Sequence, residues 1–155
     1  SKWLAEKKDA QGQPVDPLPV FSPRQWQPSQ EYPLYLINWK EASHTHSRTQ
    51  NNEWLLEIKP ANPLIMNPQT AERLGIADGE EVWVASPYGK VRAKVRISRR
   101  MHPEVVGLQH GFGHTAMGRK AAHRGTSDAV LRPTKADPLS GQGLHKEACV
   151  KVYKA

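Results

Sequence analysis

The densest cluster of polar side chains in the sequence lies between Ser43 and Thr49 and reads Ser-His-Thr-His-Ser-Arg-Thr. Its hydroxyl, imidazole and guanidinium groups put many hydrogen-bond donors into one short loop, which suits a ligand rich in ring nitrogens, carbonyls and phosphates. His44 and His46 also form a His-x-His pair, but this spacing alone is a weak indication of a metal site. Without further context, a solvated polar loop is the simpler interpretation.

The run from His110 to His114, His-Gly-Phe-Gly-His, is a second candidate. Glycines on both sides of Phe112 allow the backbone to approach a flat ligand closely, and the two imidazoles could hydrogen-bond to the edge of that ligand. The alternative is a tight glycine turn with exposed histidines. Residues 115–126, which follow, are basic.

Several familiar catalytic patterns are absent from the sequence. It contains no Ser-His-Asp order, Walker loop or zinc-protease pair, and its seven histidines lack the spacing of a metal site. Its single cysteine, Cys149, excludes an intramolecular disulfide and a cysteine-based zinc or iron–sulfur site. The apolar surroundings of Cys149 predict a buried thiol in a final strand. No residue of the chain is therefore assigned to catalysis.

The clearest prediction of structure is a short helix after residue 66. Asn67 can cap the free amides of a first helical turn, and Pro68 needs no N–H at the first helical position. Gly75 is suited to end the helix, because it adopts positive φ without strain.

Short strands are predicted around this helix. Residues 81–86 and 91–98 alternate apolar and polar side chains with the two-residue period of a half-buried hairpin, and residues 87–90 have the composition of its turn. Residues 34–39 and 105–108 predict two further strands, which place the two polar loops directly after them. We expect these strands to pair in antiparallel fashion.

Residues 1–31 have a different composition from the rest of the chain. Their prolines favour an extended lead-in over regular helix or central strand. The apolar side chains that we expect to attach this lead-in to a surface are Leu4, Val20, Phe21 and Trp26.

Three segments resemble, in the same order, the carboxy-terminal cofactor domain of the molybdopterin oxidoreductases related to dimethyl sulfoxide reductase. They are residues 32–49, 67–95 and 137–152. The resemblance implies a mainly β fold, a six-stranded double-psi β-barrel with short helices, over residues 32–155, with residues 1–31 as a linker. It also implies that the chain, at 155 residues too short for a complete enzyme of this kind, is one domain of a larger oxidoreductase and is not catalytic alone.

The same resemblance implies a cofactor and partners. Similar enzymes hold bis(molybdopterin guanine dinucleotide) with molybdenum or tungsten, the metal ligand lies in another domain, and an iron–sulfur cluster lies elsewhere in the parent enzyme. Expected partners are the remaining domains of the parent and an iron–sulfur electron-transfer subunit, with neither nucleic acid nor direct membrane insertion. The run at 110–114 is most similar to polysulfide, thiosulfate and tetrathionate reductases and less similar to arsenate and nitrate enzymes. Reduction of a sulfur oxyanion or polysulfide is therefore expected.

Cofactor contacts are carried over position by position from this resemblance. In similar enzymes the loop after the first barrel strand wraps the pterin end of the cofactor, and the second loop also faces it. The matching positions of the first loop are Asn38, Trp39, Lys40, Ser43, His44, Thr45, Ser47 and Thr49. Those of the second loop are His110, Phe112 and His114.

Two further positions come from the last third of the chain. Many relatives carry an asparagine shortly before the Asp-Pro-Leu-Ser run, and Asp128 is the nearest equivalent here. A carboxylate at this position would repel phosphate, but it could accept hydrogen bonds from a pterin or guanine edge. Lys146 follows the run at the spacing of a cofactor-contacting lysine, and its alternative is a solvated lysine at a strand edge.

The charge of the chain leaves one competing hypothesis. The formal net charge of +7 and the pI near 9.7 favour an anionic partner, for which nucleic acid is the usual candidate. Alternation places Arg92, Lys94 and Arg96 on one face of the predicted hairpin, where a stand-alone basic barrel would bind a nucleic acid or a partner subunit. The simpler interpretation of this stripe is the solvated face of a barrel strand.

Overall fold

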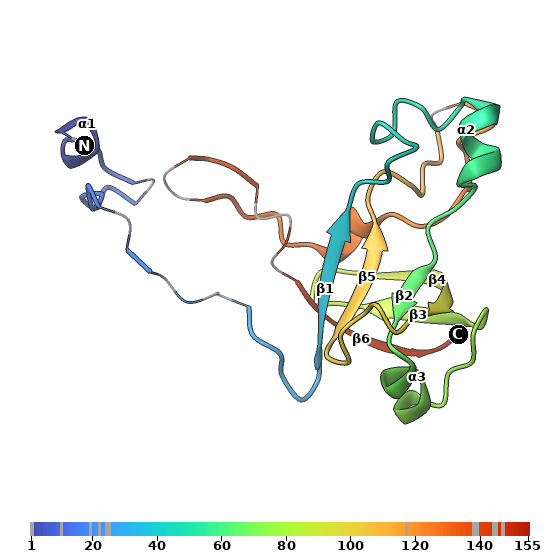
Figure 1. The fold of residues 1–155 in the computed structure, drawn as a ribbon. Helices are drawn as coiled ribbons and strands as arrows, with labels where there is room; N and C mark the ends of the chain where they lie inside the picture. Colours follow the sequence, from blue (N-terminus) through green and yellow to red (C-terminus); the bar gives the residue numbers. More distant parts are fainter. Residues whose placement is uncertain are drawn as a thin grey trace.

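The computed structural model describes residues 2–9, 11–18, 20–21, 23, 26–116, 118–137, 140–143, 146 and 148–155. The centre of this part of the chain is a closed β-barrel with the strand order β1-β5-β2-β4-β3-β6 (Figure 1). The strands are β1 (Leu34–Trp39), β2 (Leu64–Met66), β3 (Glu81–Ala85), β4 (Lys90–Ile97), β5 (Val105–Gln109) and β6 (Cys149–Lys154). The predicted mainly β, six-stranded barrel is confirmed.

Two neighbouring pairs in the barrel are parallel. β1 runs parallel to β5, and β2 runs parallel to β4, whereas the other four neighbouring pairs are antiparallel. The expected antiparallel pairing is therefore wrong for β1 with β5, and β2, the parallel partner of β4, was not among the strands predicted from their residues. Alternation along a strand shows which face is buried, but it carries no information on the direction of a partner that lies far away in the sequence.

The local predictions around the short helix are confirmed. Helix α3 (Pro68–Leu74) begins after Asn67, whose side chain accepts a hydrogen bond from the backbone N–H of Gln69 at 2.8 Å. It ends at Gly75, which has a φ of +65°. Because the cap, the first-turn proline and the αL glycine all lie within the helix or next to it, sequence alone was enough to place both ends.

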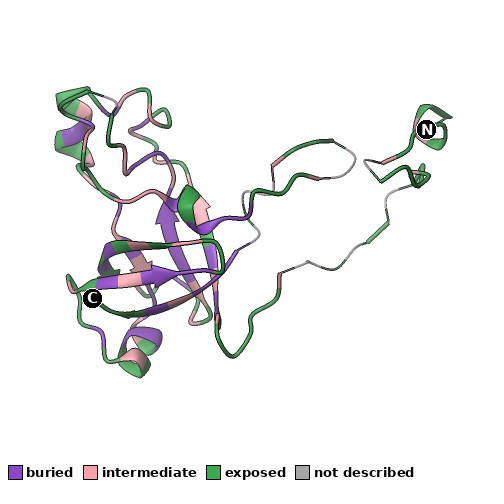
Figure 2. Ribbon diagram, turned by 180° about the vertical axis from the view of Figure 1, so that it is seen from behind, coloured by how far each residue is buried: buried purple, intermediate pink, exposed green. Residues whose placement is uncertain are grey.

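The barrel core follows from the same alternation. Leu36 of β1, Val84 of β3, Val95 of β4 and Val106 of β5 point inward and are almost fully buried. Each such side chain contributes about 1.5–3 kcal/mol relative to an exposed one. Along β4, the side chains that alternate with Val95 point outward and are exposed, so the predicted division of that strand into two faces is confirmed (Figure 2).

The lead-in runs away from the barrel (Figures 1 and 2). It begins with a four-residue helix, α1 (Lys2–Ala5), which the sequence did not predict. Trp26 attaches it to the barrel, because the indole N–H donates to the hydroxyl of Tyr88 at 2.6 Å. Val20 and Phe21 are exposed, so their expected attachment to a surface stays a prediction.

Two other short elements complete the described fold. Helix α2 (Glu53–Ile58) follows the polar loop after β1, and the 3₁₀ turn η1 (Asp128–Leu131) lies between β5 and β6. Cys149, at the start of β6, is buried as predicted. Within the described ranges, no helix has the length and apolar character needed to cross a membrane.

Candidate functional site

A cleft of about 950 Å³ opens beside the carboxyl ends of β1 and β5. One wall comes from the last residues of β1, the loop that follows it and His110 directly after β5, and another comes from Ala129, residues 132–136, Gly143 and Lys146. The parallel pairing of β1 and β5 explains why these loops meet, because Trp39 lies opposite Gln109 and both strands leave the barrel at the same end. The backbone N–H of His110 then donates to the carbonyl of Trp39 at 2.9 Å, which joins the two loops at their base.

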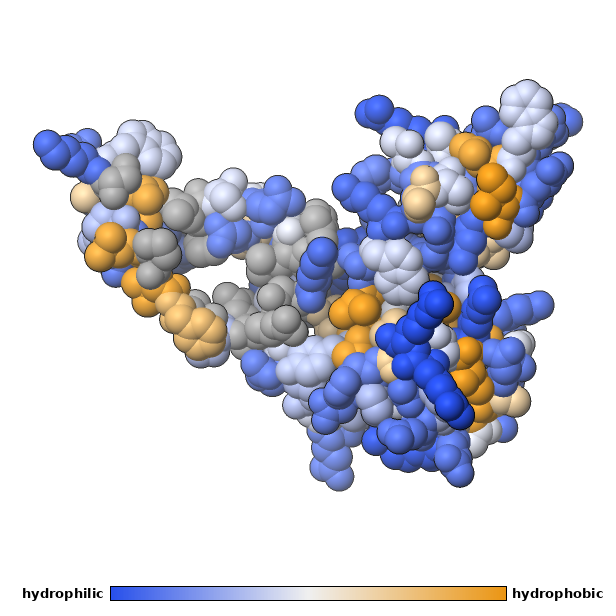
Figure 3. Space-filling view, in the orientation of Figure 1, coloured by the Kyte–Doolittle hydropathy of each residue, from blue (hydrophilic) through white to orange (hydrophobic). Residues whose placement is uncertain are grey.

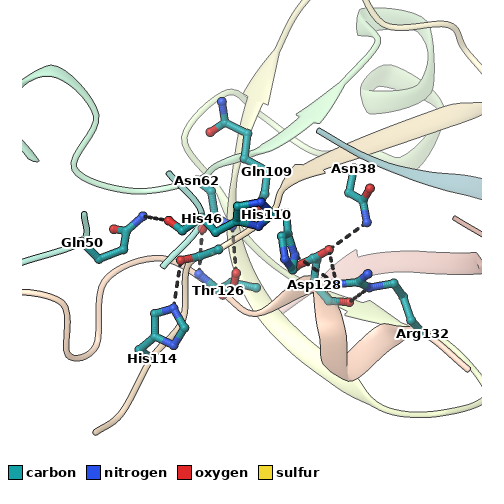
Figure 4. A network of polar contacts seen from close by, with 11 residues as sticks. Asn38, His46, Gln50, Asn62, Gln109, His110, His114, Thr126, Asp128 and Arg132 are labelled. Atoms are coloured by element: carbon teal, nitrogen blue, oxygen red, sulfur yellow. Dashed lines mark hydrogen bonds and ion pairs between the residues drawn. The ribbon is translucent and has the colours of Figure 1, made fainter. Parts of the chain in front are cut away.

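A buried carboxylate lies under one side of this cleft. Asp128 is 1% exposed and has donors from three parts of the chain around it (Figure 4). Its Oδ2 accepts from Nη2 of Arg132 at 2.8 Å and from Nδ2 of Asn38 at 3.0 Å. Its Oδ1 lies 2.9 Å from Nδ1 of His110. Asn38, His110 and Arg132 all line the cleft, so one carboxylate orients three of its side chains.

The polar loop after β1 has its own buried support. His44 is buried, with Nδ1 3.1 Å from the hydroxyl of Thr49 and Nε2 3.0 Å from the carbonyl of Lys59. Its ring also meets Phe112 edge to face, with the ring centroids 5.6 Å apart. These contacts hold the loop in place, and the side chain of His44 does not line the cleft. His46, two residues on, does line it.

Asn62 fixes the second loop from behind. Its Nδ2 donates to the carbonyls of Gln109 and Thr126 at 2.7 and 2.8 Å, and its Oδ1 accepts from the backbone N–H of Thr126 at 2.7 Å. The backbone N–H of Gly113 donates to the carbonyl of Arg124 at 2.9 Å. A buried amide side chain therefore joins the end of β5 to the chain around residue 126.

The structure brings part of the predicted set together. The predicted residues that line the cleft are Asn38, Trp39, Lys40, His110 and Lys146. Asp128 lies below them. Buried away from the cleft lining are His44 and Phe112. The loop residues that also lie outside the lining are Ser43, Thr45, Ser47, Thr49 and His114. A cofactor contact at any of these positions stays a prediction.

Sequence reasoning missed several residues of the cleft wall. Arg132, Thr134 and Lys135 line it, as does His46, although His46 lies in a loop already singled out. The four-residue spacing of Asp128 and Arg132 was a usable signal, because opposite charges at this spacing can pair across a helical turn. His46 has a φ of +50°, which nothing in its sequence neighbourhood indicates.

The basic stripe of β4 lies apart from this cleft. Arg92 is exposed and pairs with Glu81 on the neighbouring strand at 3.4 Å, and its guanidinium lies over the ring of Trp83. A hollow of about 690 Å³ on the barrel wall is lined by Arg96 and Arg100 together with apolar side chains from β1, β2 and β4. Figure 3 shows strongly hydrophilic and apolar side chains meeting over this face. Among the described residues, no group of three acidic, histidine or cysteine side chains is placed to hold a metal ion.

Similarity to known proteins decides the family. Residues 34–149 match the family model described as the Molydopterin dinucleotide binding domain. The chain belongs to this family. The match runs from the first residue of β1 to the first residue of β6, so it takes in the loops that form the cleft. The chain is thus a molybdopterin dinucleotide-binding domain, as the resemblance implied.

Its relatives are much longer proteins. It is 30% identical to a sulfite dehydrogenase subunit of Allochromatium vinosum over 90% of its own length and 17% of that protein. It is 34% identical to the thiosulfate reductase molybdopterin-containing subunit PhsA of Salmonella typhimurium over 74% of its own length and 15% of that protein. Acetylene hydratase from Pelobacter acetylenicus shares the fold, with a TM-score of 0.76 and 23% identity over 91% of this chain and 22% of that one. The chain therefore corresponds to one domain of a larger molybdoenzyme and spans less than a fifth of these two curated relatives.

The donors around the cleft fit a molybdopterin dinucleotide. Trp39 offers a flat aromatic surface, and His110 offers a ring nitrogen to the edge of a heterocycle. The ammonium groups that complement the negative charge of a pyrophosphate belong to Lys40, Lys135 and Lys146.

Proposed function

We propose that this domain holds bis(molybdopterin guanine dinucleotide) in a larger molybdenum or tungsten oxidoreductase that reduces a sulfur oxyanion or polysulfide. The observation that carries the binding part is the cleft at the carboxyl ends of β1 and β5, where aromatic, imidazole and ammonium side chains meet. The sulfur substrate is supported by relatives named for sulfite and thiosulfate chemistry. Electron transfer through an iron–sulfur partner protein belongs to the same proposal.

The cofactor, when bound, supplies the redox chemistry, and this chain supplies binding and orientation. Lys40 and Lys146 lie on the cleft as compact point charges that suit phosphate oxygens. The ring of Trp39 packs against Gly107 of β5, so closely that any Cβ at residue 107 would overlap it. This packing holds the indole in place beside the cleft.

The binding part is testable on the 155-residue chain with guanosine diphosphate as the probe, since it carries the guanine and pyrophosphate of the cofactor. Titration into ¹⁵N-labelled protein should shift the amide resonances of residues 38–40, 110 and 146. Replacing both Lys40 and Lys146 with alanine should weaken binding at least about tenfold, because each removes a charge-assisted contact of about 1.5–3 kcal/mol in a complete site.

A charge-matched control separates this cleft from the basic stripe. Replacing Arg92 and Arg96 with alanine also removes two positive charges, but both lie outside the cleft. We expect this variant to bind the probe as the wild type does. If it loses binding while the Lys40 and Lys146 variant retains it, the stripe is the anion site, and the competing nucleic-acid hypothesis should then be tested with an oligonucleotide at several salt concentrations.

The substrate part requires the parent enzyme with its cofactor. With a reduced viologen as electron donor, thiosulfate, tetrathionate and polysulfide should be reduced at higher kcat/KM than arsenate or dimethyl sulfoxide. Preference for arsenate or dimethyl sulfoxide would contradict the sulfur substrate and leave the binding role intact.

A further inference from the structure

The contacts of His110 determine which of its ring nitrogens carries the proton. Nδ1 lies 2.9 Å from Oδ1 of Asp128, and a carboxylate oxygen at that distance can only accept. An unprotonated Nδ1 would place two lone pairs against each other. Nη2 of Arg132 lies farther from Nδ1, at 3.1 Å, and donates one of its two N–H groups to Oδ2 of Asp128 at 2.8 Å, so the shorter contact of Nδ1 is the one with the carboxylate. The proton of a neutral His110 therefore belongs on Nδ1.

Other histidines of the described chain have the opposite arrangement. Nε2 of His44 lies 3.0 Å from the carbonyl of Lys59, and Nε2 of His114 lies 3.0 Å from the carbonyl of Gly111. A carbonyl oxygen only accepts, so both rings carry their proton on Nε2. Nδ1 of His102 accepts from a backbone N–H at 3.2 Å, so the proton of its neutral ring also lies on Nε2. His110 differs from these three because it alone of the four faces a buried carboxylate.

We propose that Asp128 is a positioning residue that holds His110 as a hydrogen-bond acceptor toward the cleft. With Nδ1 committed to Asp128, the acceptor Nε2 lies on the opposite edge of the ring. The side chain of His110 is 35% exposed and lines the cleft, whereas that of Asp128 is 2% exposed. Arg132 balances the charge of the carboxylate, so the imidazole need not be charged to satisfy it.

The same carboxylate orients Asn38. Its Nδ2 donates to Asp128, so the carbonyl oxygen lies on the other side of the amide. Two cleft-lining side chains thus turn their donors inward to one carboxylate and their acceptors away from it. A ligand group that meets these acceptors has to be a donor. Given the proposed function, on which this step rests, the group is an N–H of the amino-pyrimidinone edge that pterin and guanine share.

The decisive measurement is the protonation of His110 in the 155-residue chain. Long-range ¹H–¹⁵N correlation spectra distinguish protonated from unprotonated ring nitrogens. At a pH where the ring is neutral, His110 should show the proton on Nδ1, while His44 and His114 should show it on Nε2. A neutral His110 with its proton on Nε2 overturns the proposal, and this result needs no variant that might fail to fold.

Asp128→Asn tests the cause. The side-chain NH₂ of an asparagine can donate to Nδ1, so His110 should shift toward the form protonated on Nε2, while His44 stays unchanged as an internal control. An unaltered His110 in folded Asp128→Asn would show that Asp128 does not set the tautomer, and would overturn the proposal.

A binding comparison tests the specificity. Guanosine diphosphate should bind the wild type about 2- to 10-fold more tightly than inosine diphosphate, which lacks the 2-amino group, and Asp128→Asn should lower that ratio. An unchanged ratio overturns the specificity role. If neither nucleotide binds while His110 has the expected tautomer, the proposed function fails for the isolated chain, and the positioning role of Asp128 stands.

Discussion

Gly113 and Gly79 allow backbone strain to be separated from steric overlap. Both glycines have nearly the same positive φ, +78° and +80°. A Cβ added at Gly79 would meet nothing within 4 Å. A Cβ added at Gly113 would lie 2.6 Å from the carbonyl carbon of Thr126 and would overlap the backbone nitrogen of Ser127. Both atoms that a Cβ at Gly113 would meet belong to the backbone, so no side-chain rotation can relieve the overlap.

The two alanine variants should therefore differ in stability. An L-residue at this φ costs about 1–2 kcal/mol, which applies equally to Gly79→Ala and Gly113→Ala. The overlap at Gly113 adds about 1–3 kcal/mol, as for an overpacked core position. We expect Gly79→Ala to lower the free energy of unfolding by about 1–2 kcal/mol and Gly113→Ala to lower it by about 2–5 kcal/mol.

Urea denaturation of the wild type and both variants would measure this difference. The slope with denaturant should be the same in all three proteins, so that the shift in midpoint reports stability alone. In Gly113→Ala the amide resonances of residues 110–114 and 124–127 should also move, because the loop must separate from the chain it contacts. Equal destabilisation of the two variants would refute the reasoning, since it would show that loop 110–114 is not held against residues 126–127.

Three further predictions follow from buried and charged groups. Asp128→Ala should lower the free energy of unfolding by about 3–5 kcal/mol in urea denaturation, because it leaves the buried Arg132 without its carboxylate; a loss below about 1 kcal/mol would mean that Arg132 finds solvent. Asn62→Ala should lower it by at least about 2 kcal/mol, since backbone groups of Gln109 and Thr126 lose their partners, and a neutral effect would show that water replaces the amide. The pKa of Glu80 lies below its ordinary value, first because the backbone N–H of Ala77 donates to the carboxylate and then because of the ammonium of Lys154. A lowered pKa stabilises the fold above the ordinary glutamate pKa, and this contribution is lost as the pH falls through the lowered one. Thermal unfolding should therefore show wild type more stable than Glu80→Gln at neutral pH, with the difference shrinking in acid; a gap that is constant with pH would contradict this.

The sequence predicted best where the signals are local. The helix after Asn67 and the hairpin of residues 81–98 were placed correctly, because caps, turn residues and alternation act over a few positions. Pairing direction was not predictable in this way. β1 and β5 are far apart in the chain, and nothing within either strand specifies that they run parallel.

In the candidate site, too, local features were predicted and contacts between distant residues were not. The two polar loops were recognised from composition, and the cleft does lie between them and the segment after residue 128. The contact between Asn38 and Asp128 joins residues 90 positions apart, and no pattern in either neighbourhood indicates it. The burial of His44 and Phe112 was equally hidden, because a polar loop and a glycine-rich turn both suggest exposure until their packing partners are known.

The parallel pairing of β1 with β5 also has a consequence for folding. Contacts between distant parts of a chain form slowly, because the intervening loop must close before the contact is gained. The hairpin of β3 and β4 requires no such closure and can form early. The cleft depends on the distant pair, since the loops on its rim start from β1 and β5. A partly folded chain that has built only its local elements has no cleft, so recovery of ligand binding during refolding should coincide with the slowest phase, in which the barrel closes.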